Sequence, residues 1–340
     1  MLTDVDQKMK TRAQSLAKAL ETWFAGVKRP MPWRLRPTPY ACWLSEIMMQ
    51  QTTYAAVLPY YERFLRRFPS VVALAKADEA DVLKAWEGLG YYARARNLLK
   101  AAKRIVAAPG EGPVRWPATS AEWAALPGVG PYTAAALASV LDGERTPVVD
   151  GNVARVFARV WRMKDDFSKQ PNRARLAERL RPEIARAKVP GDFNQAMMEL
   201  GATVCSPTSP ACGDCPLAAA CQSRRDGTWA DYPVRPEKKA VPVRRTQAVV
   251  VTDANGRVLL VQNREGGLLK GLWELPAVEP SGELVQVFSH FRQELSTVRT
   301  LRADAEFKDP KKVPLTTATR RALLAAGCLT DGKNKTRSRG

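Results

Sequence analysis

Hydrophobic residues recur every three to four positions through most of residues 1–228, a spacing that is typical of amphipathic helices. Four early segments show this period, namely QKMKTRAQSLAKALETWFAG, TYAAVLPYYERFLRRF, DEADVLKAWEGL and YYARARNLLKAAKRIVAA. Three later segments continue it, namely NVARVFARVWRM, NRARLAERLRPEIARA and DFNQAMMELGATVC. Short connections with proline or glycine separate these segments, so the pattern predicts a compact helical body.

The pattern changes at residues 229–244, where proline and basic residues dominate and no apolar period remains. This composition predicts a linker. Beyond it, TQAVVVTDANGRVLLVQNR holds two β-branched runs joined by Asn255-Gly256, which predicts a β-hairpin. We therefore predict a second, mixed α/β domain over residues 245–330, followed by a basic, disordered tail at 331–340.

The chain is strongly basic, with 53 Lys and Arg against 34 Asp and Glu and a formal charge of +19. Such an excess favours a polyanionic partner, nucleic acid before an anionic membrane, although solubility alone is the alternative. One concentration of basic residues lies between Arg173 and Arg186. No run of about twenty apolar residues predicts a membrane span, and the N-terminal residues lack an apolar signal core. We expect a cytoplasmic protein with no membrane partner.

Four of the six cysteines lie close together, with the spacing Cys-x6-Cys-x2-Cys-x5-Cys. A cytoplasmic protein keeps few disulfides, so this grouping predicts a metal or cluster site. Four thiolates on a short loop can hold zinc or a cubane iron–sulfur cluster. Zinc loops more often show two Cys-x2-Cys pairs, whereas this array has one. Its members are Cys205, Cys212, Cys215 and Cys221.

The segment LPGVGPYTAAAL at residues 126–137 predicts a tight turn between two helices, with Ser120 as the N-cap of the first helix and Pro131 opening the second. Backbone N–H groups of Gly128, Val129 and Gly130 would then face outward at a helix N-terminus and bind a phosphate. The segment is therefore interpreted as a helix–hairpin–helix DNA-binding element, and an ordinary helical turn is the alternative.

Two carboxylates are candidates for chemistry. Glu46 lies in WLSEIMMQQTT, where its neighbours one turn away are mostly apolar. Such a carboxyl either has a raised pKa or is partly exposed and paired with an arginine. Asp150 follows the apolar run PVV and precedes a helix, so it suits an N-cap. Capping and catalysis can coexist there, because the cap fixes the direction of the carboxylate.

Together, the hairpin, the Asp150 loop and the cysteine array resemble the helix–hairpin–helix DNA glycosylase superfamily of the endonuclease III type. The segments PWR, TPYACWLSEIMMQQTT, GLGYYARARN and NQAMMELGA narrow the resemblance to adenine DNA glycosylases of the MutY type. It implies a mainly α N-terminal part, with a six-helix module at 36–144 and a [4Fe-4S] cluster module formed by 1–35 and 145–228. It also implies that residues 245–330 form an α/β Nudix-like domain.

The resemblance also assigns roles to the candidate residues. Glu46 would protonate the flipped adenine as a general acid, and an ionised Asp150 would stabilise the sugar cation. Asn152 would orient groups nearby by hydrogen bonding. Tyr132 stands where strand-cutting relatives carry lysine, and a tyrosine cannot form their Schiff base. We therefore expect a monofunctional glycosylase, even if Tyr132 only packs.

Further contacts follow from the same matching. The adenine pocket would be lined by Trp33, Arg34, Met49 and Glu199. Gln51 and Tyr91 would enter the helical stack of the DNA. LLKGLWELPAVE resembles the Nudix-like domain of the family, but no metal-binding acid set follows it, so we expect a binding module. Its FSH motif would read 8-oxoguanine through Phe288, Ser289 and His290.

We thus expect a monomeric adenine DNA glycosylase of base excision repair that binds double-stranded DNA carrying A:8-oxoguanine or A:G mispairs. It would leave an abasic site and carry one [4Fe-4S] cluster. Two competing functions stay open. One is a related mismatch glycosylase of the thymine type, and the other is a non-catalytic DNA-binding scaffold with a structural cluster.

Overall fold

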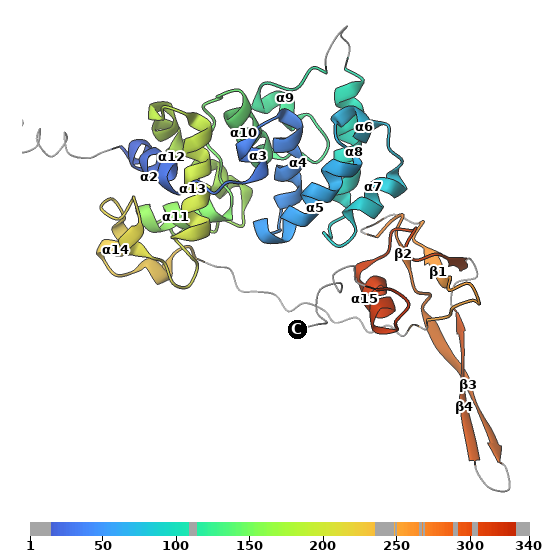
Figure 1. Ribbon diagram of the computed structural model, residues 1–340. Helices are drawn as coiled ribbons and strands as arrows, with labels where there is room; N and C mark the ends of the chain where they lie inside the picture. Colours follow the sequence, from blue (N-terminus) through green and yellow to red (C-terminus); the bar gives the residue numbers. More distant parts are fainter. Residues whose placement is uncertain are drawn as a thin grey trace, which may run out of the picture. The chain divides into compact units, whose positions relative to one another are not determined.

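The computed structural model describes residues 15–108, 114–234, 248, 250–264, 267, 269–287, 292–300 and 305–330 (Figure 1). The chain divides into two compact units. The first comprises Met1–Ile47 and Ala108–Lys239, and the second comprises Met48–Ala107 and Ala240–Gly340. Each unit therefore combines segments that are far apart in the sequence.

The first unit is helical. Its elements are α2 (Leu16–Val27), α3 (Pro32–Leu35), most of α4 (Pro39–Met49), α9 (Ser120–Ala124), α10 (Pro131–Leu141), α11 (Gly151–Trp161), α12 (Gln170–Arg186), α13 (Pro190–Thr203), η1 (Cys212–Asp214), α14 (Gln222–Arg225) and η2 (Trp229–Asp231). Helix α13 contacts α2, α10, α11 and α12, and Figure 1 shows it between α11 and α12. Phe24, Phe157 and Phe193 are almost fully buried in the core between these helices.

Two glycines of α13 permit its close contacts with neighbouring helices. A Cβ at Gly191 would lie 2.8 Å from the carbonyl oxygen of Ser139 on α10. A Cβ at Gly201 would lie 2.5 Å from Cβ of Asn152, in the first turn of α11. Only glycine fits at such distances, because any side chain would clash with backbone or with a fixed Cβ. The start of α11, with Asp150 and Asn152, is thereby held against α13.

The second unit joins four helices to a small α/β part. Its helices are α5 (Tyr54–Arg67), α6 (Val71–Ala75), α7 (Glu79–Trp86) and α8 (Ala93–Val106). The α/β part has the strands β1 (Val258–Gln262), β2 (Trp273–Glu274), β3 (Val278–Val287), β4 (Arg292–Thr300) and β5 (Glu306–Lys308), and the helix α15 (Thr317–Ala325). Strands β2, β1 and β5 form one antiparallel sheet, and β3 pairs with β4. The predicted combination of a helical body with a small sheet is confirmed.

Most predicted helices are present, but the predicted N-cap at Ser120 needs correction. The N-cap of α9 is Thr119, which forms a capping box with Glu122, whereas Ser120 is already helical and donates to Glu144. At Asn255-Gly256 the chain turns with Gly256 at φ 72°. The second run becomes β1, and the described part of the first run turns back along it through the antiparallel Thr252–Val258 bridge. The Asp253 N–H donates to the Arg257 carbonyl at 3.0 Å and the Leu259 N–H donates to the Val251 carbonyl at 2.9 Å, so the predicted hairpin is confirmed in its described residues.

The first residues of the predicted linker belong to the helical body. Residues 229–231 form η2, and Tyr232 is buried in the core of the first unit. The guanidinium of Arg159 donates to the carbonyls of Trp229 and Tyr232 at 3.1 and 3.0 Å. The chain leaves this unit later than residue 229, and most of the predicted linker lies outside the described residues. No described helix is long and apolar enough to cross a membrane.

Candidate active site

Asp150 caps α11 as the sequence predicts. Its Oδ1 accepts a hydrogen bond from the Val153 N–H at 2.7 Å, and its Oδ2 accepts one from the Asn152 amide at 2.9 Å. Burial raises the pKa of Asp150, while these two hydrogen bonds oppose the rise because they favour the carboxylate. The cap therefore fixes a carboxylate in one orientation at a positive helix end.

Glu46 lies on α4 and is only half-buried, yet protein surrounds its carboxyl. Burial raises its pKa to about 7, and the negative charge of Asp150 adds to this rise. A hydrogen bond from Tyr132 and the positive charge of Arg34 act in the opposite direction. Burial also raises the pKa of the Cys42 thiol, one turn before Glu46, to about 12. Glu46 thus holds and releases a proton near neutrality.

Tyr132 is in the first turn of α10 and contributes its hydroxyl to the same place. Burial and the charges of Glu46 and Asp150 raise the pKa of Tyr132 well above its ordinary value, so the phenol stays protonated. The hydroxyl interacts with Glu46 and also donates to the Met198 sulfur at 3.0 Å. Glu46, Tyr132, Asp150 and Met198, called the Glu46 cluster below, come from α4, α10, α11 and α13.

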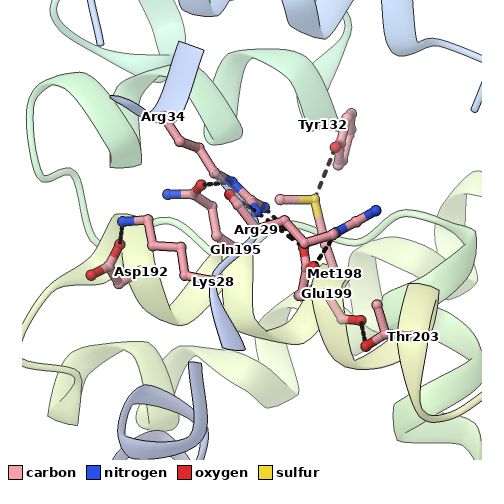
Figure 2. Close-up of polar contacts among 9 residues, drawn as sticks. All are labelled: Lys28, Arg29, Arg34, Tyr132, Asp192, Gln195, Met198, Glu199 and Thr203. Carbon is pink, nitrogen blue, oxygen red and sulfur yellow. Dashed lines mark hydrogen bonds and ion pairs between the residues drawn. The ribbon is translucent and has the colours of Figure 1, made fainter. Parts of the chain in front are cut away.

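A buried ion-pair network adjoins this cluster (Figure 2). Glu199 is 2% exposed, and its Oε2 accepts from both Nη atoms of Arg34 and from Nη2 of Arg29, all at 3.1 Å. The Nε of Arg29 pairs with the other oxygen of Glu199. Gln195 accepts from Nε of Arg34 at 2.7 Å. The structure thus brings together Arg34 and Glu199, two residues assigned to the adenine pocket, and adds Arg29 and Gln195, which no local sequence pattern singles out. The contact of Arg34 and Glu199 with adenine stays a prediction.

Two other residues predicted for the adenine pocket are placed less directly. Trp33 is 7% exposed on α3, and its carbonyl accepts from the Cys42 thiol at 3.7 Å, one turn from Glu46. Met49 is the half-buried last residue of α4 and belongs to the second unit. Their contact with adenine stays a prediction.

The predicted hairpin joins α9 to α10. Gly128 has φ 79°, a left-handed conformation that favours glycine, and Gly130 is the N-cap of α10 with Pro131 at its first position. Both glycines are exposed, while the Val129 side chain is 6% exposed. The Val129 N–H donates to the Leu126 carbonyl at 3.2 Å, so it serves the turn and does not face outward. The N-terminus of α10 nevertheless remains suited to an anion.

Gln51 and Tyr91, the predicted wedges, both have left-handed backbones, with φ of 59° and 48°. Both side chains are exposed, Tyr91 to 54%. A buried Arg94 connects the two turns, since its guanidinium donates to the carbonyls of Met48, Gln50, Leu89 and Gly90 at 2.9, 2.6, 3.2 and 3.4 Å. Such strained, exposed residues on a rigid support are typical of contact sites.

The four cysteines of the array line one cavity in the first unit. Burial, with the neighbouring thiolates, raises the pKa of Cys215 to about 11, so thiolates there need a positive centre. Within the described residues, no group of three or more His, Cys, Asp or Glu side chains is suited to hold a metal ion. Four thiols that line one cavity are nevertheless the donor set that zinc or an iron–sulfur cluster requires.

Arg155 and Arg159 connect this cavity to α11. Arg155 donates to the Asn152 side chain at 2.8 Å and to the Cys205 carbonyl at 2.9 Å. Arg159 is 2% exposed, and its Nη1 lies 3.3 Å from the Cys205 sulfur. The sequence shows both only as ordinary helical arginines, because their partners are distant in the chain. The predicted 8-oxoguanine motif, Phe288, Ser289 and His290, lies outside the described residues.

Comparisons with known proteins agree with this arrangement. Residues 44–182 match the HhH-GPD superfamily base excision DNA repair proteins. The chain is 35% identical over 324 residues to an adenine DNA glycosylase of Homo sapiens, covering 78% of this chain and 58% of the human protein. It is 32% identical over 335 residues to an adenine DNA glycosylase of Schizosaccharomyces pombe, covering 81% and 72% respectively.

The fold resembles the solved structure of a thermostable thymine-DNA glycosylase, with a TM-score of 0.55 and 24% identity over 66% of this chain and all of that chain. The predicted helix–hairpin–helix glycosylase fold is thereby confirmed. The chain spans less than two thirds of the length of several curated relatives, including the human protein. Its sequence and fold together show that the chain belongs to the adenine DNA glycosylase family of the helix–hairpin–helix base excision DNA repair proteins.

Proposed function

We propose that the chain is a monofunctional DNA glycosylase that removes adenine paired with 8-oxoguanine or guanine and leaves an abasic site. The observation that carries this proposal is a pair of carboxyls with different environments at one place. Glu46 has a pKa of about 7, whereas Asp150 is held by two hydrogen-bond donors at the start of α11. Such a pair divides the work into an acid and an anion.

In the proposed reaction, adenine is flipped out of the duplex and its N7 accepts the proton of Glu46. Protonation makes the base a better leaving group, so the bond between the base and the sugar can break without a strong nucleophile. Glu46, then ionised, can accept a proton from the water that attacks the sugar. A pKa near the working pH suits both steps, because either form of the carboxyl is readily reached.

Asp150 stabilises the positive charge that develops on the sugar, either by electrostatics or by transient covalent attack. Asn152 keeps Oδ2 of Asp150 in place, and the Val153 N–H keeps Oδ1 in place. Two fixed donors leave the carboxylate little rotational freedom, which lowers the reorganisation needed in the transition state. Tyr132 offers no amine for a Schiff base, so the strand is not cut.

The cysteine cavity supports the proposal that Cys205, Cys212, Cys215 and Cys221 hold a [4Fe-4S] cluster. Once bound, such a cluster supplies four iron–thiolate bonds that tie the loop from α13 to α14 into one rigid unit. Arg159 would donate to the Cys205 sulfur, and Arg155 would hold the adjacent Cys205 carbonyl near Asn152. The loop and the catalytic end of α11 are connected in this way.

Double-stranded DNA is the proposed partner of a monomeric protein. The net charge of +19, the hairpin before α10 and the exposed Gln51 and Tyr91 support it. The small sheet of the second unit is consistent with a Nudix-like binding module. Recognition of 8-oxoguanine by Phe288, Ser289 and His290 is proposed from the FSH motif alone.

Single-turnover cleavage tests the proposed function. Four duplexes each carry one central A:8-oxoguanine, A:G, T:G or A:T pair, and products are read with and without alkali. We expect alkali-dependent breaks at adenine opposite 8-oxoguanine and guanine only. Glu46→Gln should abolish them, while Glu62→Gln, an exposed glutamate on α5, should retain the wild-type rate.

The other outcomes identify the competing functions. Breaks at T:G would indicate a thymine-type mismatch glycosylase, and breaks without alkali would indicate a lyase. Binding without breaks on any duplex, by protein whose visible absorption shows an intact cluster, would support the non-catalytic scaffold. Equal loss of activity in Glu46→Gln and Glu62→Gln would remove the argument for Glu46.

A further inference from the structure

The Tyr132 hydroxyl has one proton and two acceptors within reach. In the structure it donates to the Met198 sulfur at 3.0 Å (Figure 2). The same hydroxyl interacts by hydrogen bonding with the Glu46 carboxyl. All three side chains are half-buried, so water does not fully satisfy them. One O–H can donate strongly to only one acceptor at a time.

The stronger acceptor depends on the charge of Glu46. An ionised carboxylate accepts a charge-assisted hydrogen bond, which is stronger than one to a neutral thioether. A protonated carboxyl has less need of a donor and can itself donate to the tyrosine oxygen. The tyrosine proton then needs another acceptor, because a buried donor without a partner is costly. Met198 supplies that acceptor on the adjacent face of α13.

We propose that Met198 is a positioning residue that alternates with the Glu46 carboxylate as the acceptor of the Tyr132 hydroxyl proton. The sulfur accepts while Glu46 is protonated and ready to act as an acid. The hydroxyl turns to Glu46 once the proton has been given away. The exchange of acceptors is a property of the unliganded protein. Only its effect on the pH dependence of adenine excision rests on the proposed glycosylase function.

Other titratable and charged groups also face Glu46. Asp150 faces it from the start of α11, and Arg34 faces it from α3. The charge of Arg34 is largely committed to Glu199 on α13. Cys42, one turn away on α4, stays a neutral thiol because burial raises its pKa to about 12. Met198 is therefore the neutral partner, since its sulfur can gain or lose the hydrogen bond from Tyr132 without any change of charge.

The exchange can be observed without any substrate. The full-length protein is labelled with ¹³C at its methionine methyl groups, and the methyl spectrum is recorded as pH rises through neutrality. We expect the Met198 methyl resonance, assigned from its loss in Met198→Leu, to shift with a midpoint near the Glu46 pKa of about 7. The shift should disappear in Glu46→Gln and in Tyr132→Phe. A Met198 resonance that does not change across this range would overturn the proposal.

Activity gives a second readout. Glu46 must be protonated to act as an acid, so the excision rate falls as pH rises through its pKa. Met198→Leu removes the alternative acceptor and disfavours protonated Glu46, which moves this alkaline limb down by about half a pH unit. Leucine has a similar volume, so folding is preserved. The matched control is Met197→Leu, because Met197 is the adjacent residue on α13 and its side chain is fully buried. This variant should leave the alkaline limb at its wild-type pH.

A double-mutant cycle isolates the hydroxyl. In a Tyr132→Phe background no proton is shared, so Met198→Leu should cause no further shift of the limb. An equal shift in that background, or an equal shift in Met197→Leu, would show a general packing effect and overturn the proposal. Wild-type protein that releases adenine from no duplex would refute the proposed function and this catalytic consequence. The methyl titration would still decide the exchange of acceptors by itself.

Discussion

At the scale of single residues, Glu46 has a cost to stability. In the unfolded chain its carboxyl ionises near 4.5, whereas in the folded protein burial raises the pKa to about 7. The folded state therefore binds the proton more tightly. Stability is lost as pH rises from the unfolded pKa to the folded pKa, by at most about 3 kcal/mol. Above that range the cost stays constant.

Glu46→Gln should therefore stabilise the protein at alkaline pH while abolishing activity. We expect its free energy of unfolding in urea to exceed that of the wild type by about 2 kcal/mol at pH 8. The difference should nearly vanish below about pH 4, because the wild-type carboxyl is then protonated in both states. Glu62→Gln should show no such dependence. A pH-independent difference for Glu46→Gln would mean that the carboxyl is not perturbed in the fold.

The sequence shows Glu46 and Asp150, because an acid in an apolar stretch and an acid at a helix start are local signals. It does not show Arg29 or Met198. Arg29 is 170 positions from Glu199, and Tyr132 is 66 positions from Met198. No local pattern contains such pairs, since they form only when α13 packs against α10 and against the segment that follows α2.

At the scale of elements, the hairpin between α9 and α10 has two glycines with different backbone needs. Gly128 has φ 79°, whereas Gly130 has φ −83°, and a Cβ added to Gly130 would meet no atom within 4 Å. Gly128→Ala should lower the free energy of unfolding by about 1 kcal/mol or more. Gly130→Ala should change it by less than about half that. Urea unfolding of both variants measures the difference, and equal losses would contradict the assigned turn.

Arg94 connects the turn that contains Gln51 with the turn that contains Tyr91. In the sequence it stands beside Arg96 as one of several basic residues, yet it is 9% exposed and donates to four backbone carbonyls. Helical spacing places Arg94 on the apolar face of α8, but the sequence does not show its partners Met48 and Gln50, which are 46 and 44 positions away. The strained turns at Gln51 and Tyr91 depend on these carbonyl contacts.

Arg94→Lys keeps the charge but loses the planar fork that reaches both turns. We expect the single-turnover rate of adenine excision, at saturating enzyme, to fall about tenfold, equivalent to about 1.4 kcal/mol of lost positioning. Arg104→Lys, at an exposed position on the same helix, should retain the wild-type rate. Equal rates for both variants would show that the connection between the turns has no part in excision.

At the scale of the whole molecule, the basic run between Arg173 and Arg186 is a weaker sign of a polyanionic partner than its arginines suggest. Three of these arginines lie against acids: Arg175 pairs with Asp165, Arg181 with Glu178, and Arg186 with Glu183. The net charge already counts these acids, but the structure shows which arginines they accompany. The remaining arginines of α12, and not the whole run, are therefore the better candidates for contact with a phosphate backbone.

Within the second unit, the Glu87 carboxylate connects the helices to the α/β part. Composition does not show this contact. This carboxylate is 7% exposed and pairs with Lys84 at 2.8 Å and with Arg320 of α15 at 3.0 Å. Lys84 also donates to the Val313 carbonyl at 2.8 Å, and the Tyr92 hydroxyl donates to the Leu315 carbonyl at 3.2 Å. Helix α7 and the N-cap of α8 thereby contact the C-terminal α/β part through polar groups centred on a buried carboxylate.

Glu87→Gln should loosen this contact without unfolding the first unit. Its half-buried partners Lys84 and Arg320 would lose their counterion, which costs about 2 kcal/mol, equivalent to about a 30-fold rise in local opening. Hydrogen exchange should therefore quicken in α7 and α15, while α11 and α13 keep wild-type protection. Glu62→Gln, exposed on α5, should change neither region. Uniformly faster exchange in all four helices would instead show that the two units unfold as one cooperative body, and unchanged exchange would show that Glu87 does not hold the α/β part in place.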